Sequence, residues 1–241
     1  MSYITRVINR AANLAGFDIR RLGHDSKTVR ELLKGIGHFE IDLILDVGAN
    51  EGQFAEELLS LGYKGRMVSF EPLSEAHRKL ERAAERYSGW TVHPRCALGA
   101  HDGEVTINIA GNSVSSSILP MMASHVSASA GSAYIGAEKT PVYRLDTAAE
   151  PYLRDALRPF LKIDAQGYEW QVLDGAGEIL PRMSGVLCEL SLVPLYEGQR
   201  LWLDIVSRLE GEGFTLWSMH RAFTDPRDGR TLQVDAAIFR T

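Results

Sequence analysis

Cysteine is scarce in this sequence: its 241 residues include only Cys96 and Cys188. Two isolated cysteines provide neither a disulfide framework nor the spacing of a zinc site. Each lies in an apolar run typical of a buried strand, where a free cysteine behaves as a small hydrophobic residue. We therefore interpret both as core residues, and a reducing cytoplasm fits them.

Long hydrophobic runs and excess positive charge are also missing. No run approaches the roughly 20 apolar residues of a membrane span, and residues 1–17 lack the apolar core of a signal peptide. The formal net charge is −5, with a hydrophobic fraction of 45% and a charged fraction of 24%. These values are typical of soluble proteins, so we expect a cytoplasmic protein that does not bind nucleic acids.

The first 37 residues predict a helical extension to a main domain at 38–241. Apolar residues recur at helical spacing from Ile4 to Leu14, and a second short helix is expected over 25–33. The extension is more basic than the rest of the chain. Two interpretations stay open: a helix that covers an edge of the main domain, or a peripheral contact with an anionic membrane or a glycolipid.

The main domain alternates between strand and helix patterns. We predict strands at 42–47, 66–70, 90–97, 160–164, 185–192, 214–219 and 234–239, and helices at 51–61, 74–87, 169–173 and 201–209. An extra strand is expected at 105–109, followed by a long loop with short helical pieces at 110–139. Buried strands alternating with helices predict an α/β fold whose mostly parallel sheet has helices on both faces.

The first predicted strand leads into a glycine-containing turn, from Asp46 through Gly48 to Gly52. A dinucleotide site would instead present Gly-x-Gly-x-x-Gly, which places a pyrophosphate on the helix N-terminus. S-adenosylmethionine (SAM) has no phosphate, and its sulfonium and ammonium groups favour carboxylate and carbonyl oxygens. The turn therefore favours SAM over a dinucleotide.

The second predicted strand ends at Glu71, about one βαβ step after this turn. An acidic residue in this place is suited to hydrogen-bond a ribose diol, because a carboxylate can accept two hydroxyl donors. That geometry serves SAM and NAD alike. Glu71 thus indicates a nucleoside without choosing between the two.

Over roughly residues 41–240, the sequence resembles the FkbM family of methyltransferases. The resemblance rests on separated motifs in the same order: Leu45–Gly52, Phe70–Pro72, Ala97–Gly99 with Asp102–Glu104, Arg144–Asp146, Leu161–Glu169 and Val172–Ala176. It implies a Rossmann-like class I methyltransferase fold, with a seven-stranded sheet whose last strand is antiparallel. The implied activity is SAM-dependent O-methylation, often of sugar hydroxyls in antibiotics, glycolipids or surface glycans. The usual acidic residue before Gly167 is Gln166 here.

The resemblance also implies a set of cofactor-binding residues. The first turn should line the methionine end of SAM, Glu71 should hold the ribose, and the end of the third strand should border the adenine. The residues assigned in this way are Asp46, Gly48, Ala49, Asn50, Gly52, Glu71, Pro72, Ala97 and Leu98.

Three residues near strand ends are candidates for the base that accepts the hydroxyl proton: Asp164, Glu189 and His220. Each also has a structural interpretation: Asp164 orients its loop, Glu189 caps a helix or pairs with an arginine, and His220 is a surface residue. Asp164 with Glu189 also resembles the carboxylate pair of magnesium-dependent O-methyltransferases. Two carboxylates are few ligands for a metal ion, so we predict no metal site and do not favour magnesium.

The expected partner is a small molecule, glycan or glycolipid acceptor. Its hydroxyls would suit the serine-rich stretch 112–117 at the start of the long loop, although a solvent-exposed loop is the alternative. Two other functions stay open: a NAD-type oxidoreductase on a similar sheet, and a non-catalytic binding subunit with a SAM fold. A homo-oligomer is also left open.

Overall fold

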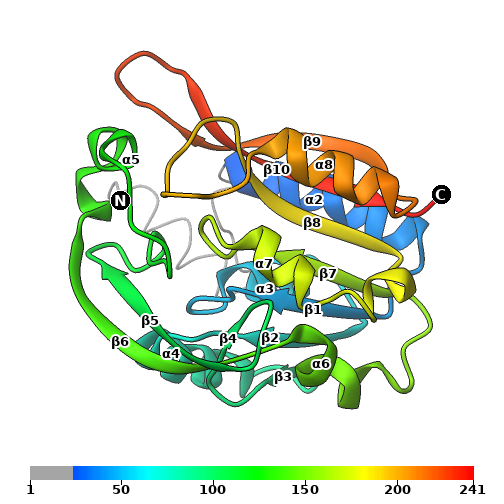
Figure 1. Cartoon of the computed structure of the whole chain (residues 1–241). Helices are drawn as coiled ribbons and strands as arrows, with labels where there is room; N and C mark the ends of the chain where they lie inside the picture. Colours follow the sequence, from blue (N-terminus) through cyan, green and yellow to red (C-terminus); the bar gives the residue numbers. More distant parts are fainter. Residues whose placement is uncertain (1–23) are drawn as a thin grey trace, which may run out of the picture.

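The computed structural model describes residues 24–241, which form a seven-stranded sheet with the order β3-β2-β1-β7-β8-β10-β9 (Figure 1). Its strands are β1 (Leu43–Val47), β2 (Arg66–Phe70), β3 (Trp90–Val92), β7 (Pro159–Ile163), β8 (Gly185–Ser191), β9 (Thr215–Thr224) and β10 (Thr231–Phe239). All neighbours from β3 to β8 are parallel, and β10 is antiparallel to both β8 and β9. The mostly parallel sheet and its antiparallel last strand are therefore confirmed.

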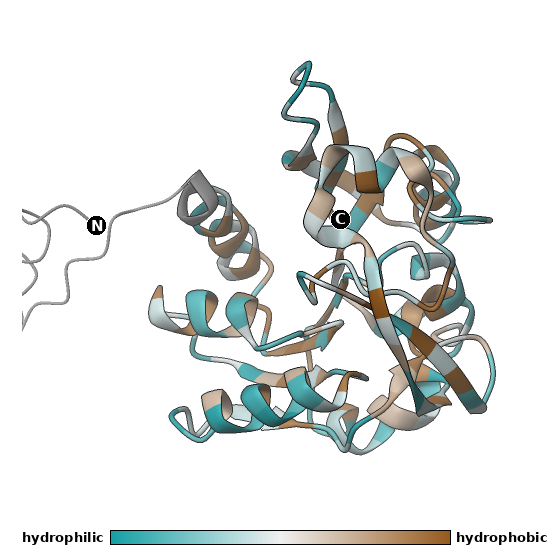
Figure 2. Ribbon diagram, turned by 90° about the vertical axis from the view of Figure 1, so that its left-hand side faces the viewer, coloured by the Kyte–Doolittle hydropathy of each residue, from teal (hydrophilic) through white to brown (hydrophobic). Residues whose placement is uncertain are grey.

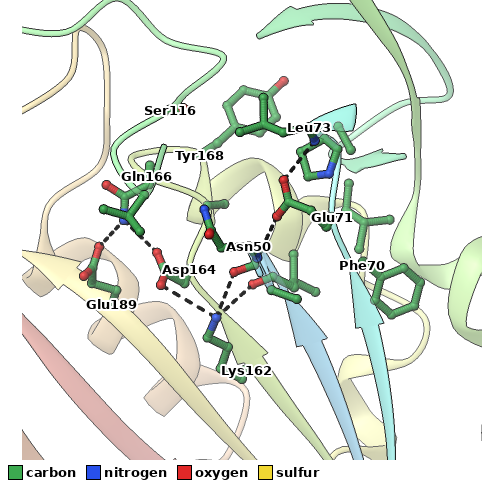
Figure 3. Close-up of a pocket in the computed structure, with 18 of the residues that line it drawn as sticks. Asn50, Phe70, Glu71, Leu73, Ser116, Lys162, Asp164, Gln166, Tyr168 and Glu189 are labelled. Atoms are coloured by element: carbon green, nitrogen blue, oxygen red, sulfur yellow. Dashed lines mark hydrogen bonds and ion pairs between the residues drawn. The ribbon is translucent and has the colours of Figure 1, made fainter. Parts of the chain in front are cut away.

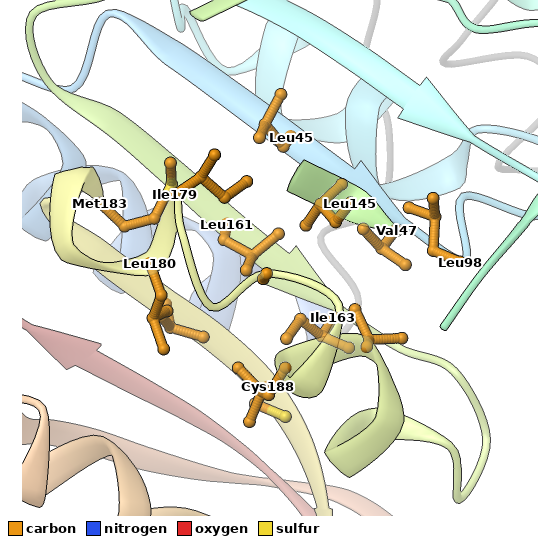
Figure 4. Close-up of a cluster of buried hydrophobic side chains, with 14 of the residues drawn as sticks. Leu45, Val47, Leu98, Leu145, Leu161, Ile163, Ile179, Leu180, Met183 and Cys188 are labelled. Carbon is orange, nitrogen blue, oxygen red and sulfur yellow. The ribbon is translucent and has the colours of Figure 1, made fainter. Parts of the chain in front are cut away.

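Helices cover both faces of this sheet. They are α2 (His24–His38), α3 (Gln53–Ser60), α4 (Ser74–Ala84), α6 (Leu145–Leu153), α7 (Glu169–Asp174) and α8 (Trp202–Gly211). One buried cluster packs β1, β7 and β8 against α6, α7 and α8, and Figure 4 shows part of it. A second packs the opposite face against α2, α3 and α4. Figure 2 shows helices of mixed hydropathy around largely apolar strands, as burial of one helical face requires.

A second sheet of three strands has the order β4-β6-β5, with β4 (Ala97–Leu98), β5 (Gly103–Ala110) and β6 (Tyr134–Tyr143). The expected strand at 90–97 is thus two strands in different sheets. The loop expected at 110–139 ends in the long strand β6, which pairs with β5. Gly136 and Pro141 make β6 difficult to predict from the sequence, because both residue types are uncommon inside strands. Short helices α5 (Ala123–Ala128) and η1 (Ala130–Ser132) do occur before β6.

Other differences concern element lengths. Helix α2 is longer than the predicted 25–33, and β9 continues five residues past the predicted end at 219. Helix α6 was not predicted, and it contains Pro151, a residue that normally argues against a helix interior. A 3-10 turn, η2 (Leu180–Arg182), precedes β8. The helix expected between residues 4 and 14 lies outside the described residues.

No helix within residues 24–241 is both long and apolar enough to span a bilayer.

Candidate functional site

A cavity of about 460 Å³ lies at the carboxyl ends of β1, β2 and β7 (Figure 3). Strand β1 pairs with β2 on one side and with β7 on the other, so chain order reverses at this point. Open α/β sheets bind ligands at such a switch point, and the volume is in the range of small-molecule sites. The cavity is therefore the candidate functional site.

The turn after β1 brings the backbone of two neighbouring strands close together. Gly48 has φ +74°, and a Cβ added there would lie 1.8 Å from the carbonyl oxygen of Asp164. Only glycine permits both the left-handed backbone and this approach. Gly48 lines the cavity together with Ala49 and Asn50.

Gly52 was expected to bind the cofactor, and the structure shows a reason for a glycine at this position that needs no ligand. It has φ +94° at the start of α3, and an added Cβ would lie 2.5 Å from the ring of Trp90. Gly52 is not among the residues that line the cavity. A glycine is required at this position by the left-handed backbone at the start of α3 and by the close packing of the Trp90 ring.

Glu71 closes the end of β2 and lines the cavity. Its carboxylate accepts hydrogen bonds from the backbone N–H groups of Asn50 at 2.7 Å and Leu73 at 2.8 Å. Burial raises the pKa of Glu71 to about 7, although these donors and Lys162 act in the opposite direction. The two N–H donors fix the carboxylate in place, and each oxygen keeps further capacity to accept a hydroxyl.

A buried ion pair lies beneath the cavity. Asp46 is fully buried, and its carboxylate accepts a hydrogen bond from Ser69 Oγ at 3.0 Å and lies 3.1 Å from Lys162 Nζ. Burial alone would lower the pKa of Lys162, but Asp46 and Asp164 outweigh burial and raise it above its ordinary value. Asp46 does not line the cavity. It pairs with Lys162, which does line it.

Asp164 faces the cavity directly after β7, and Glu189 faces it from within β8, two residues before that strand ends. The side-chain amide of Gln166 donates to Asp164 Oδ1 and to Glu189 Oε2, at 2.7 Å each (Figure 3). Burial, reinforced by Asp164, Asp235 and Glu169, raises the pKa of Glu189 well above its ordinary value. The structure therefore brings two of the three base candidates together.

His220 is not brought to the cavity. Because β9 continues to Thr224, His220 lies inside the strand and not at its end. Its register partner is Asp235, and its Nε2 lies 3.5 Å from a carboxylate oxygen of Glu31 on α2. The strand-end argument for His220 fails because the strand was predicted too short.

The wall of the cavity that was expected to border an adenine is largely apolar. Pro72, Ala97 and Leu98 line it as expected, and Cys96, Ile107 and Ile118 lie beside them. Cys96 and Cys188 are both free and buried, in agreement with their interpretation as core residues.

A family model for the methyltransferase FkbM domain matches residues 46–216. The chain belongs to the FkbM methyltransferase family. Comparison with curated protein sequences finds no match.

Several solved structures of methyltransferases are similar to this chain. The methyltransferase domain of a bacterial Hen1 protein has 6% identity and a TM-score of 0.50, covering 90% of this chain and 98% of that one. The 1,6-didemethyltoxoflavin-N1-methyltransferase of Burkholderia thailandensis, solved with S-adenosylhomocysteine, has 14% identity and a TM-score of 0.46, covering 90% and 79%. Aeropyrum pernix fibrillarin, solved with SAM, has 11% identity and a TM-score of 0.44, covering 81% and 66%.

The site of this FkbM chain fits SAM on three observations. Glu71 offers a fixed carboxylate at the end of β2, Gly48 leaves the turn after β1 without a side chain, and the adenine side is apolar. No group of three or more His, Cys, Asp or Glu side chains suited to a metal ion occurs in residues 24–241.

Sequence reasoning missed several residues of this FkbM site. Glu169 accepts hydrogen bonds from the backbone of Ala165 at 3.1 Å and Gly167 at 3.0 Å, so it holds the loop after β7. Lys162 and Glu169 both lie within the motif 161–169 that carried the resemblance, and that motif was the available signal. No sequence motif indicated Tyr196, because it lies 30 residues from Gln166 in the chain.

Proposed function

We propose that this methyltransferase transfers the methyl group of SAM to a hydroxyl of a sugar in a glycan, glycolipid or natural product. The observation that supports this proposal is the pair of bridged carboxylates, Asp164 and Glu189, at the wall of the cofactor cavity. A hydroxyl is a weak nucleophile, and a base that takes its proton during transfer contributes about 10²–10⁴-fold.

In this proposal the cofactor lies along the ends of β1, β2 and β7. Glu71 accepts hydrogen bonds from the ribose hydroxyls, and the turn from Gly48 to Asn50 surrounds the methionine end. Pro72, Ala97 and Leu98 border the adenine. Asp46 and Gly52 support these residues from outside the cavity.

The chemistry then depends mainly on orientation. The methyl group of SAM is already activated, so the site has to align the acceptor oxygen with it, an effect that can supply roughly 7–11 kcal/mol. Asp164 lies 3.6 Å from Lys162 Nζ, and about a third of its side chain (34%) is exposed, so an acceptor hydroxyl can reach it. This makes Asp164 the better placed of the two carboxylates to receive the proton.

The alternatives left by the sequence are less well supported. The FkbM match favours a methyl donor over a nicotinamide cofactor. A non-catalytic role would leave the bridged carboxylates without a function.

Two measurements test the proposal. Calorimetry of the purified chain should detect SAM binding, and no binding of SAM or S-adenosylhomocysteine would contradict it. SAM with a labelled methyl group should then label a hydroxyl-bearing component of cell extracts or glycolipid fractions, with mass spectrometry locating the methyl on oxygen. Transfer to nitrogen or carbon would contradict the O-methylation. The labelling should survive EDTA.

The affinity for SAM should depend on pH through Glu71. Because Glu71 titrates near pH 7, its anion disappears as the pH falls below 7, and the affinity should fall by up to about tenfold per pH unit. Glu71→Gln should weaken binding by about 1.5–3 kcal/mol and remove this pH dependence. Calorimetric titrations from pH 5.5 to 8.5 would measure both effects, and the ligand's own amino group titrates equally in both proteins. Equal slopes in the two proteins would remove Glu71 from the ribose site.

A further inference from the structure

The loop after β7 carries a side-chain amide that contacts two catalytic candidates at once. Gln166 has a left-handed backbone with φ +50°, and its carbonyl oxygen accepts a hydrogen bond from Ser117 Oγ at 2.6 Å. From this fixed backbone its Nε2 donates to Asp164 and to Glu189 (Figure 3). An amide nitrogen has two hydrogens, and each carboxylate receives one of them.

The orientation of the amide is determined from its other end. The hydroxyl of Tyr196 lies 2.7 Å from Gln166 Oε1 and donates to it. Tyr196 is fully buried and packs against the ring of His125, so its hydroxyl stays in place. A flipped amide would turn its oxygen toward two carboxylate oxygens, which is repulsive. Tyr196 and the two carboxylates therefore favour the same orientation.

This arrangement holds two acidic groups close together without adding charge. Two neighbouring carboxylates do not both ionise easily, because each anion disfavours the other. The amide reduces this cost, since it donates to both. Lys162 compensates Asp164 at 3.6 Å, and Gln233 Nε2 donates only to Glu189, at 2.7 Å.

We propose that Gln166 is a positioning residue that couples Asp164 and Glu189 into one proton-accepting unit, and that Tyr196 fixes the orientation of its amide. The inference rests on the proposed function. In the reaction, the acceptor oxygen forms a bond to the methyl carbon while the bond from carbon to sulfur breaks. The electron pair of the broken bond stays on sulfur, and the hydroxyl proton passes to the carboxylate unit.

Gln166→Glu is the principal test, because it keeps the size of the side chain and replaces the donor with a third carboxylate. The titrations of Asp164 and Glu189 should both move upward by about one pH unit or more. Carboxyl-carbon NMR of the labelled full chain would measure them, with Asp164→Asn and Glu189→Gln identifying the signals. Gln233→Glu is the matched control, since it places a new carboxylate beside Glu189 alone and should raise the titration of Glu189 without raising that of Asp164.

Two further variants keep the test decisive if Gln166→Glu folds poorly. Gln166→Met removes both donors without adding charge, and it should also move both titrations upward. Tyr196→Phe leaves the amide but frees its orientation, so it should move both titrations in the same direction by a smaller amount. Unmoved titrations in all three folded variants, with only a lower melting temperature, would overturn the proposal and leave Gln166 a structural role.

Activity provides a separate readout, with the acceptor found by the labelled-methyl screen. Gln166→Glu should lower kcat at pH 7 by about tenfold or more and shift the pH profile upward. If no acceptor is methylated, the proposed function fails while the NMR titrations still decide the coupling. If methyl transfer persists in Gln166→Glu with an unchanged pH profile, only the coupling fails.

Discussion

Asp164→Asn and Glu189→Gln should each lower kcat by about 10²–10⁴-fold, because the first removes the carboxylate best placed to receive the hydroxyl proton and the second breaks the carboxylate unit to which it belongs. The affinity for SAM should change little, since the cofactor needs no proton transfer to bind. Steady-state kinetics with the identified acceptor, together with calorimetry of SAM binding, would separate the two effects. In the parent protein, activity should fall as the pH drops through the pKa of the carboxylate pair. That fall should come at a higher pH than for an isolated carboxylate, because burial and neighbouring anions raise the pKa of Glu189.

His220→Ala is the matched control for these variants. His220 was also a base candidate, but its side chain contacts Glu31 on α2 and does not line the cavity. We expect its kcat to stay close to that of the parent protein. A loss in His220→Ala as large as that in Asp164→Asn would contradict this assignment, and full activity in Glu189→Gln would remove Glu189 from the proton-accepting unit.

The sheet and the cofactor end of the site were predictable from local sequence. Alternating apolar strands and helices indicate a parallel sheet because both of its faces are buried. The turn at Gly48 and the acid at Glu71 are visible because they occupy fixed places after consecutive strands. Strands β1 and β2 then bring these residues to one edge, as register pairing of Val47 with Phe70 shows.

The errors arose where function depends on strand length or on distant partners. The prediction for His220 assumed a strand that ends at residue 219. The side chains along β9 are exposed or half-buried, and this pattern did not indicate that the strand continues to Thr224. The partnership of Lys162 with Asp46 depends on register between β1 and β7. The contact between Tyr196 and Gln166 depends on a loop path that no local pattern encodes.

Lys162→Met should lower the free energy of unfolding by about 3–5 kcal/mol, the usual cost of removing one partner of a buried ion pair. Methionine fills most of the space of the lysine stem, so packing is largely retained. The loss arises because the carboxylate of Asp46, which has no exposed surface, loses the cation that it pairs with. Lys162 also donates to the carbonyl oxygen of Gly48 at 3.1 Å, so the turn after β1 loses a donor too. Chemical denaturation would measure the change.

Lys139→Met is the matched control, because it breaks the ion pair with Glu104, whose two side chains are largely exposed. Exposed pairs are screened by water, so this variant should unfold close to the parent protein. The double variant Asp46→Asn with Lys162→Met should recover part of the loss, since it leaves no uncompensated buried charge. A Lys162→Met protein as stable as Lys139→Met would show that the pair contributes nothing. If instead the double variant were no more stable than Lys162→Met, the loss of stability would come from the missing donor at the turn of Gly48. It would not come from the buried carboxylate of Asp46.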